Sequence, residues 1–457
     1  MTLETSSLRR SIIAFPALAL VFWLGFGDPD GPLFHGRPLF FWLRQVPLEA
    51  SARHPETLDA LVTLEAHSGP TLRRALTAAA GPLKNLQTQA HRFAPLLFPP
   101  PRDLESSRGF AVEVARHRSD QGQYLLPELT EAFRVTSRAE VRESIVQVLC
   151  TLGENGMAAL STLALEPDFA GSEAAIRALD GFYLSAPETA TNRAHIAAIA
   201  SARLASSNVN VILAANHALV RTGDAAPMGI PGVFSNLSHG SPGVRAASAQ
   251  TFARIGRDDP RCIPALLTLL ADSNPEVRAA SASGLGYLGA DAAEAVPLLE
   301  HVLLDEPLPV ALAALQSLGR IGPKAASAVP GIADLLHMES PSPVLKAAAA
   351  TALGRIGRQP EKAIPGLVHA IHDPDTYVRC QAARALSAFG AQAEPAVTAL
   401  SGALFDPVEA VRIHAAEALA SIGPAAHSAV PALIAARNNN QSVMSPPVMA
   451  ALARIQP

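Results

Sequence analysis

Apolar positions follow a helical spacing through the C-terminal half of the chain. In residues 262–289, an apolar face recurs every three or four positions from Val277 to Leu288, which is the spacing of an α-helix. Pro264 marks the first turn of a preceding helix, where a missing N–H does no harm. Gly289 supplies the left-handed position that ends the second helix. The pattern predicts two short helices joined by a turn.

This two-helix pattern repeats. The step Val277-Arg278 is echoed every 33 or 34 residues, at Val244-Arg245, Val310-Ala311, Val344-Leu345, Val378-Arg379 and Val411-Arg412. Glycines that close the unit recur at nearly the same interval, at 223, 256, 289, 322, 357, 390 and 423. Neither helix of such a unit buries its apolar face alone, so neighbouring units must stack. The sequence therefore predicts an all-α, right-handed α-solenoid of helical-hairpin repeats.

The repeat has a family resemblance. Its pattern D-x-x-P-x-V-R-x-x-A-A-x-A-L-G-x-I-G resembles HEAT repeats, specifically the kind found in phycobilisome lyases. In that family an aspartate of the inter-helix turn and an arginine six residues later form a ladder between repeats. The matching residues here are Asp272 with Arg278, Asp373 with Arg379, and Asp406 with Arg412. The unit at Val310 has Ala311, and the unit at Val344 has Leu345, in the arginine position, so we expect an interrupted ladder.

The N-terminus carries a different signal. Residues 11–27 are an uncharged, almost wholly apolar run between Arg10 and Asp28. Seventeen helical residues span about 25 Å, slightly less than the hydrocarbon core of a bilayer. We expect an uncleaved signal anchor, with residues 1–10 in the cytoplasm and a single-pass protein whose repeat array lies outside it. One alternative is a signal peptide whose cleavage leaves a secreted or periplasmic protein, and the other is a buried helix of a soluble protein.

The remainder divides by regularity. Residues 28–123 form an irregular juxtamembrane and divergent helical region, and the segment 31–46 resembles one that precedes repeats in bacterial membrane-associated HEAT proteins. We expect divergent HEAT-like repeats over 124–228. Regular repeats with a short closing helix are expected over 229–457.

The charge and the cysteine content disfavour several classes of function. The net charge is −4 and no polybasic run is present, so we expect no nucleic-acid partner. The three cysteines lie more than 100 residues apart, which is neither a disulfide framework nor a zinc spacing.

Two motifs invite a chemical interpretation. Residues 284–289 satisfy G-x-G-x-x-G, but a dinucleotide site needs a preceding strand, and here the glycines lie within a helix. His369 and His372 fall on one helix face without a third ligand at a recognisable spacing. We therefore expect no cofactor, no metal and no catalytic residues.

A surface pattern remains. Near the end of each second helix, successive repeats present Arg254, Tyr287, Arg320 and Arg355, and four positions earlier Gln250, Ser283, Gln316 and Thr351. These side chains form two parallel rows, and the candidate partner-binding stripe is Arg254, Tyr287, Arg320, Arg355, Gln250 and Gln316. The alternative is that the arginines only offset the helix dipole and solvate the surface.

The sequence thus favours a non-catalytic, membrane-anchored scaffold that binds a protein partner. Two alternatives stay open. One is a HEAT-type lyase or maturation factor that acts on a protein-bound cofactor, because the resemblance includes lyases. The other is a mechanical spacer without a ligand.

Overall fold

The computed structural model describes residues 33–34, 37–38, 112, 125–166, 171–185, 190–305, 307–338, 342–438 and 445–456. The expected helix at 11–27 and nearly all of the region 28–123 lie outside these residues. From 33 to 38, two short antiparallel strands, β1 (Leu33–Phe34) and β2 (Arg37–Pro38), pair with each other. All other described elements are helices, so the all-α class is confirmed for this part of the chain.

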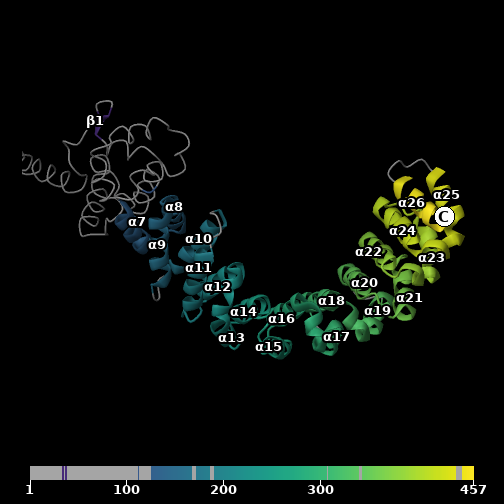
Figure 1. Ribbon diagram of the computed structural model, residues 1–457, viewed down its shortest axis with the longest axis horizontal. Coiled ribbons are helices and arrows are strands. Elements are labelled where there is room, and N and C mark those ends of the chain that lie inside the picture. The colour runs from purple at the N-terminus through teal and green to yellow at the C-terminus, as the bar shows by residue number, and fades with distance from the viewer. Residues whose placement is uncertain are drawn as a thin grey trace, which may run out of the picture. The chain divides into compact units, whose positions relative to one another are not determined.

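Chain contacts divide the protein into two units, residues 1–218 and 219–457. Besides β1 and β2, the elements of the first unit are helices: α7 (Leu126–Val135), α8 (Ala139–Thr151), α9 (Gly153–Leu165), α10 (Ser172–Ser185), α11 (Ala190–Arg203) and α12 (Val209–Arg221), the last of which crosses the boundary (Figure 1). Helices α7, α8, α9 and α10 pack successively on one another. Their core is built of large apolar side chains that are almost completely buried, among them Phe133, Ile145, Leu160 and Leu179.

The second unit is a stack of helical hairpins. The first helices of the hairpins are α13 (Ile230–Asn236), α15 (Cys262–Leu269), α17 (Val296–Asp305), α19 (Val329–His337), α21 (Pro360–Ala370), α23 (Val397–Ala403) and α25 (Val430–Asn438). The second helices are α14 (Pro242–Ile255), α16 (Pro275–Leu288), α18 (Leu308–Ile321), α20 (Pro343–Ile356), α22 (Thr376–Ser387), α24 (Glu409–Ile422) and α26 (Ser445–Ile455). Each second helix packs on the next one. Within this unit the second helices form one row and the first helices another, with the second helices on the inner side of the curve (Figure 1).

Two apolar positions of the second helix hold the stack together. Near its start, Val244, Val277, Val310, Val378 and Val411 are completely buried, and in its last turn so are Phe252, Leu285, Leu318, Leu353, Leu386 and Leu419. Burying one such side chain contributes roughly 1.5–3 kcal/mol. The repetition of these two positions along the stack explains why the hairpins stack and do not stand alone.

The second helices begin and end at recognisable residues. Side-chain oxygens of Asn274, Ser342 and Asp375 accept backbone N–H groups at the starts of α16, α20 and α22. At the ends, the closing glycines 223, 289, 322, 357, 390 and 423 have positive φ. Gly256 differs, with φ −106°, and a Cβ there would collide with the Phe252 ring.

A 3-10 helix links most hairpins, which the sequence analysis did not predict. These linkers are η3 (Gly223–Gly229), η4 (Gly289–Ala295), η5 (Gly322–Ala328), η6 (Gly390–Ala396) and η7 (Gly423–Ala429). In η4 to η7, alanines three residues apart are buried, for example Ala325 and Ala328. Side chains at this spacing are eclipsed in a 3-10 helix, so both alanines face the core.

Among the described residues, one run, Glu409–Asn438, is long and apolar enough by length and composition to cross a membrane. Half of it is buried inside the protein. The run is α24, η7 and α25 in succession, with a break at Gly423 where φ is +68°. It therefore consists of the second helix of one hairpin, the linker and the first helix of the next hairpin.

Candidate functional site

Two rows of exposed side chains run across the second helices. The arginine row is Arg254, Tyr287, Arg320 and Arg355, one from each of α14, α16, α18 and α20, and all four side chains are exposed. The polar row, one helical turn earlier, is Gln250, Ser283, Gln316 and Thr351, of which the two glutamines are exposed and the other two half-buried. Because each second helix packs on the next, each row is continuous across four repeats. We call the surface that carries both rows the second-helix face.

The first two members of the arginine row touch each other. The guanidinium carbon of Arg254 lies 5.6 Å from the centre of the Tyr287 ring, which is cation–π contact. Tyr287 nonetheless remains 52% exposed. This contact restrains two large side chains of neighbouring repeats and leaves their outer surfaces free to bind.

The next two members of the row have no charged partner. Arg320 and Arg355 form no ion pair with any described residue and lie in the last turns of α18 and α20. A cation in that position also offsets the helix dipole by a few tenths of a kcal/mol. The structure therefore places the six candidate stripe residues on one surface, with two guanidinium groups free to take an anion.

The second-helix face extends beyond the predicted stripe. Arg384 on α22 takes the position of the polar row in the next repeat and is exposed, while Glu417 follows at this position on α24. Thr351 of the polar row donates a hydrogen bond of 3.2 Å to Gln381, which links this row to α22. The sequence analysis missed Arg384 because this residue lies one turn earlier in its helix than the other arginines. Aligning the second helices of the repeats by their first residues would have revealed it.

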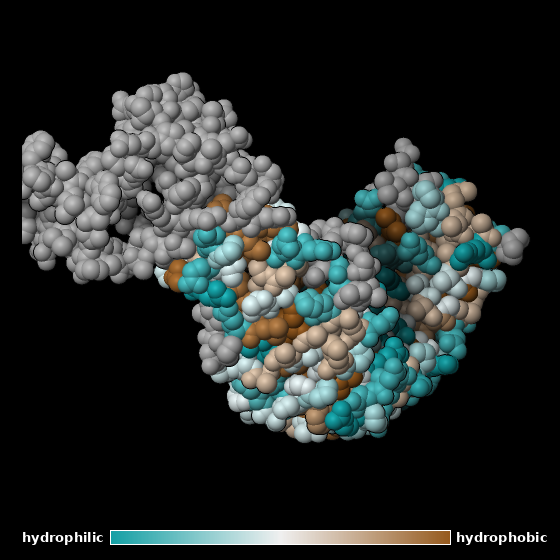
Figure 2. Space-filling view, turned by 60° about the vertical axis from the view of Figure 1, so that its left-hand side comes forward, coloured by the Kyte–Doolittle hydropathy of each residue, from teal (hydrophilic) through white to brown (hydrophobic). Residues whose placement is uncertain are grey.

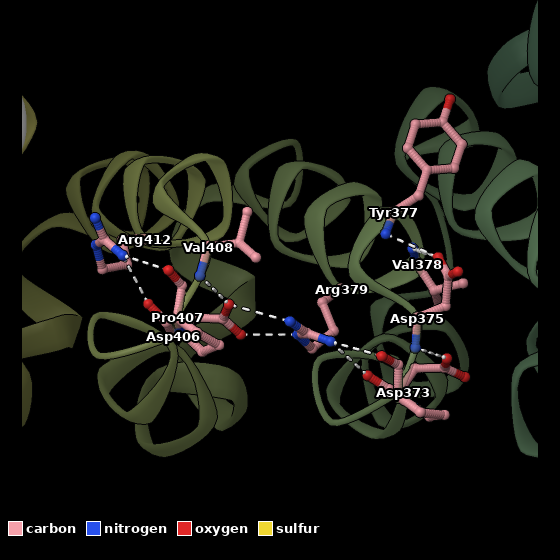
Figure 3. Close-up of polar contacts among 10 residues, drawn as sticks. Asp373, Asp375, Tyr377, Val378, Arg379, Asp406, Pro407, Val408 and Arg412 are labelled. Carbon is pink, nitrogen blue, oxygen red and sulfur yellow. Dashed lines mark hydrogen bonds and ion pairs between the residues drawn. The ribbon is translucent and has the colours of Figure 1, made fainter.

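A separate set of cations is fully engaged in holding the repeats together. Arg379 donates from Nε and Nη2 to the two carboxylate oxygens of Asp406 in the next repeat, over 2.7 and 3.1 Å (Figure 3). Arg245 binds Asp272 in the same way, over 2.8 and 2.7 Å. These side chains are only 10–15% exposed. The ladder consequently joins Arg245 and Arg379 each to the aspartate 27 residues later.

Within a repeat, the arginine contacts the backbone of its own turn. Nη1 of Arg278 donates to the carbonyl of Asp272 over 2.7 Å, and Nη1 of Arg412 donates to the carbonyl of Asp406 over 2.8 Å. The pairing that the sequence analysis gave for these residues therefore holds through the carbonyl oxygen and not through the carboxylate. The carboxylate of Asp406 turns instead to the preceding repeat and accepts the N–H of Val408 (Figure 3).

The expected interruption at Val344 was wrong. In α14, α16, α18, α22 and α24 the valine is the third residue of the helix, but Val344 is the second residue of α20. Leu345 is therefore the buried residue, and Val344 is 53% exposed. Lys346 then takes the cation position, and its Nζ lies 3.0 Å from Oδ2 of Asp373. At α18, by contrast, Ala311 does occupy the cation position and is buried.

These contacts shift the acidity of the ladder aspartates. Hydrogen bonds from Arg245 hold the pKa of Asp272 below its usual range. Burial raises the pKa of Asp406, but the hydrogen bonds from Arg379 and the Val408 amide, together with the charges of Arg379 and Arg412, lower it by more, so its pKa also lies below the usual range. Both carboxylates are charged at neutral pH, as the ladder requires.

Comparison with known proteins identifies the repeat. A family model described as HEAT repeats matches residues 230–319, 329–400 and 364–445. Residues 230–445 are HEAT repeats. This confirms the family resemblance of the sequence over these residues. No curated protein matches the chain.

Solved structures agree on the fold. The structure titled "Kap95:Nup1 complex" is similar with a TM-score of 0.54 at 13% identity, over 91% of this chain and 61% of that one. At this identity the likeness shows the fold alone, which is a helical solenoid. The complex of CpcE and CpcF of phycocyanin lyase from Nostoc sp. PCC7120 is 25% identical over 49% of this chain and 92% of that one, with a TM-score of 0.33. So low a TM-score does not indicate a common arrangement of repeats.

The glycine motif is explained by packing between HEAT repeats. A Cβ on Gly286 would lie 2.7 Å from the Cα of Ser317 on the next second helix, and one on Gly284 would lie 3.1 Å from the Cβ of Ala253 on the previous one. Gly289 has φ +63° and ends the helix. The spacing G-x-G-x-x-G therefore arises from two close helix contacts and one helix end.

The histidine pair does not share a helix face. His369 lies on α21, whereas His372 follows the end of that helix at Ala370. The ring of His369 instead lies 5.0 Å, between centroids, from His337 of the preceding HEAT repeat. Within the described part of the chain, no three His, Cys, Asp or Glu side chains are grouped so that they could hold a metal ion.

A serine–histidine contact in the first unit was missed by the sequence analysis. Ser161 Oγ lies 3.0 Å from Nε2 of His195, a spacing that a hydrolytic dyad would use. Ser161 also donates its hydroxyl hydrogen to the carbonyl of Met157 over 2.8 Å and is buried. The hydroxyl therefore has a backbone acceptor besides its contact with the histidine. This arrangement ties α9 to α11.

Proposed function

We propose that the HEAT repeats form a non-catalytic scaffold that binds a protein partner along the second-helix face. The observation that carries this proposal is the pair of continuous rows, in which exposed glutamines lie beside arginines that have no ion-pair partner. Repeat stacks offer an extended surface of this kind, because each unit adds the same positions at a regular spacing.

The surface visible in Figure 2 is consistent with polar recognition of a partner. In the view of Figure 2, hydrophobic residues of the coloured part are dispersed in small groups among hydrophilic ones. Such a surface suits a partner that is recognised by polar and charged groups more than one recognised by a broad apolar patch.

We further propose that the apolar segment 11–27 holds the protein in a membrane and that the repeats lie outside the cytoplasm. The composition of that segment and the flanking Arg9 and Arg10 support this. Extraction of membranes with alkaline carbonate should leave the full chain in the pellet. Added protease should reach the repeats only from the extracytoplasmic side, and protection on that side would contradict the topology.

Binding is tested by charge reversal with a matched control. The full chain is purified from membranes with its bound proteins, as the wild type, as Arg320→Glu/Arg355→Glu, and as Lys362→Glu/Arg437→Glu. Lys362 and Arg437 are exposed on the first helices α21 and α25, so both double variants change the net charge equally. We expect the first variant to lose the partner and the second to keep it. Retention by the first variant would refute the proposed surface.

A further inference from the structure

The chain uses its arginines in two distinct ways, and the difference points to a ligand. Arginines at the start of a second helix, such as Arg245 and Arg379, each bind a carboxylate of the next repeat through two hydrogen bonds. Arg320 and Arg355 are exposed, and no described acid lies within ion-pair distance of them. The chain therefore supplies a carboxylate to the cations that hold its repeats together, and leaves the carboxylate for the second-helix face to another molecule.

The charged side chains at the positions of the two rows all have the same sign from α14 to α22. From α14 to α22, the positions of the polar row are Gln250, Ser283, Gln316, Thr351 and Arg384, and those of the arginine row are Arg254, Tyr287, Arg320, Arg355 and Ala388. These positions include four arginines and no acid, although the protein as a whole has a net charge of −4. The first acid at these positions is Glu417 on α24. A ligand complementary to this face is acidic.

The polar row indicates that the ligand is an extended peptide. Gln250 and Gln316 are exposed and form no hydrogen bond with a described residue, so their amides are free both to donate and to accept. An extended chain has backbone N–H and C=O groups that need such partners, whereas a helix satisfies its own. Glutamines in every second repeat are thus suited to hold a main chain while the arginines bind its side chains.

The distance between neighbouring repeats determines how far apart the acidic residues of a bound peptide must be. Packed helices lie about 10 Å apart, and an extended chain advances about 3.3 Å per residue. One repeat therefore corresponds to about three residues of an extended peptide. Carboxylates three residues apart fall opposite successive positions of the arginine row.

The start of the second helices adds an apolar border. Val344 and Tyr377, at the second positions of α20 and α22, are 53% and 58% exposed. Tyr377 points away from the ladder contacts below it (Figure 3). At the same position α16 carries Glu276, which is exposed, so this edge of the face is apolar at α20 and α22.

We infer that the second-helix face binds an extended acidic segment of a protein, with carboxylates at every third residue. This rests on the proposed function and specifies the partner's chemistry. The arginine row binds the carboxylates, the polar row binds the main chain, and Val344 and Tyr377 contact apolar side chains of the segment.

The test uses the full chain in detergent and three fluorescent fifteen-residue peptides of glutamate, glycine and serine. One has glutamate at every third position, one has the same five glutamates in a block, and one has glutamine in place of glutamate. Fluorescence anisotropy should show the spaced peptide binding at least five-fold more tightly than the block, and the glutamine peptide not binding. Arg320→Glu/Arg355→Glu should weaken the spaced peptide at least ten-fold, and Lys362→Glu/Arg437→Glu less than two-fold.

Three results would overturn the inference: equal binding of the spaced and block peptides, equal losses in the two double variants, or equally tight binding of a single-stranded oligonucleotide of the same charge. The last would indicate a general polyanion surface. If these results arise while Arg320→Glu/Arg355→Glu still loses the native partner, the acidic segment is wrong and the scaffold stands. If that variant keeps the native partner, the scaffold itself is wrong. Circular dichroism of each variant verifies that the helices remain folded.

Discussion

The ladder between HEAT repeats gives the most quantitative prediction. Replacing Asp406 by alanine removes both carboxylate bonds to Arg379 and the one to the Val408 amide, of 2.7, 3.1 and 2.8 Å. Arg379 keeps bonds of 3.0 Å to the carbonyls of Asp373 and Pro374, so its charge is not left wholly unpaired. Breaking a buried ion pair costs about 3–5 kcal/mol and an exposed one about 0–1. For a pair that is 13% and 10% exposed, we expect a loss of about 2–3 kcal/mol at the α22–α24 interface.

The assay must report on this interface alone, because a repeat stack unfolds by parts. Hydrogen exchange of the backbone amides in α22 and α24 does so, and about 2–3 kcal/mol corresponds to roughly 30- to 150-fold faster exchange. The control is Asp291→Ala, which removes the pair with Arg257, whose side chains are 58% and 55% exposed. We expect it to leave exchange in η4 and α16 nearly unchanged. Similar small effects of the two substitutions would refute a stabilising role for the ladder.

Three further predictions follow from single groups. The pKa values of Asp272 and Asp406 lie below the usual range, so their contribution to stability is present above about pH 4 and is lost as the pH falls through the folded-state pKa. Urea unfolding should show that the free energy of unfolding decreases over this acidic range, and Asp406→Ala should make that decrease smaller. Gly286→Ala should lower the melting temperature because a Cβ there meets the next helix, whereas Gly402→Ala, with nothing within 4 Å, should not. Burial raises the pKa of Cys262 to about 12, so iodoacetamide at pH 8 should label it only after unfolding, as mass spectrometry would show, and rapid labelling of the native protein would contradict its burial.

The fold could be predicted because the repeat multiplies a weak signal. One helix with Val277 and Leu285 on its apolar face is ambiguous, but the same face in successive units leaves stacking as the only way to bury it. The 3-10 linkers were missed because a repeat of small residues resembles loop composition. The sequence did contain a pattern that indicates these linkers, namely two alanines three residues apart after the closing glycine, as in Ala325 and Ala328.

The site could be predicted only in part, for two physical reasons. Which partner an arginine finds depends on a neighbouring repeat. The sequence paired Asp272 with Arg278 of its own repeat, whereas in the packed structure its carboxylate binds Arg245 of the preceding repeat. The register of a helix also depends on its cap. Ser342 caps α20, so that Val344 is the second residue of the helix and not the third as in other units. This shift of one residue places Lys346 at the ladder position, which the sequence analysis did not predict.

The central claim, that a partner lies along the second-helix face, is tested most directly by site-specific photo-crosslinking. A benzoylphenylalanine is placed at Gln316 on the second-helix face, or at Asp334, which is exposed on the first helix α19. After irradiation of cells that produce the full chain, the first position should give a discrete adduct with a partner protein, and Arg320→Glu should abolish it. An adduct at Asp334 with none at Gln316 would contradict the account.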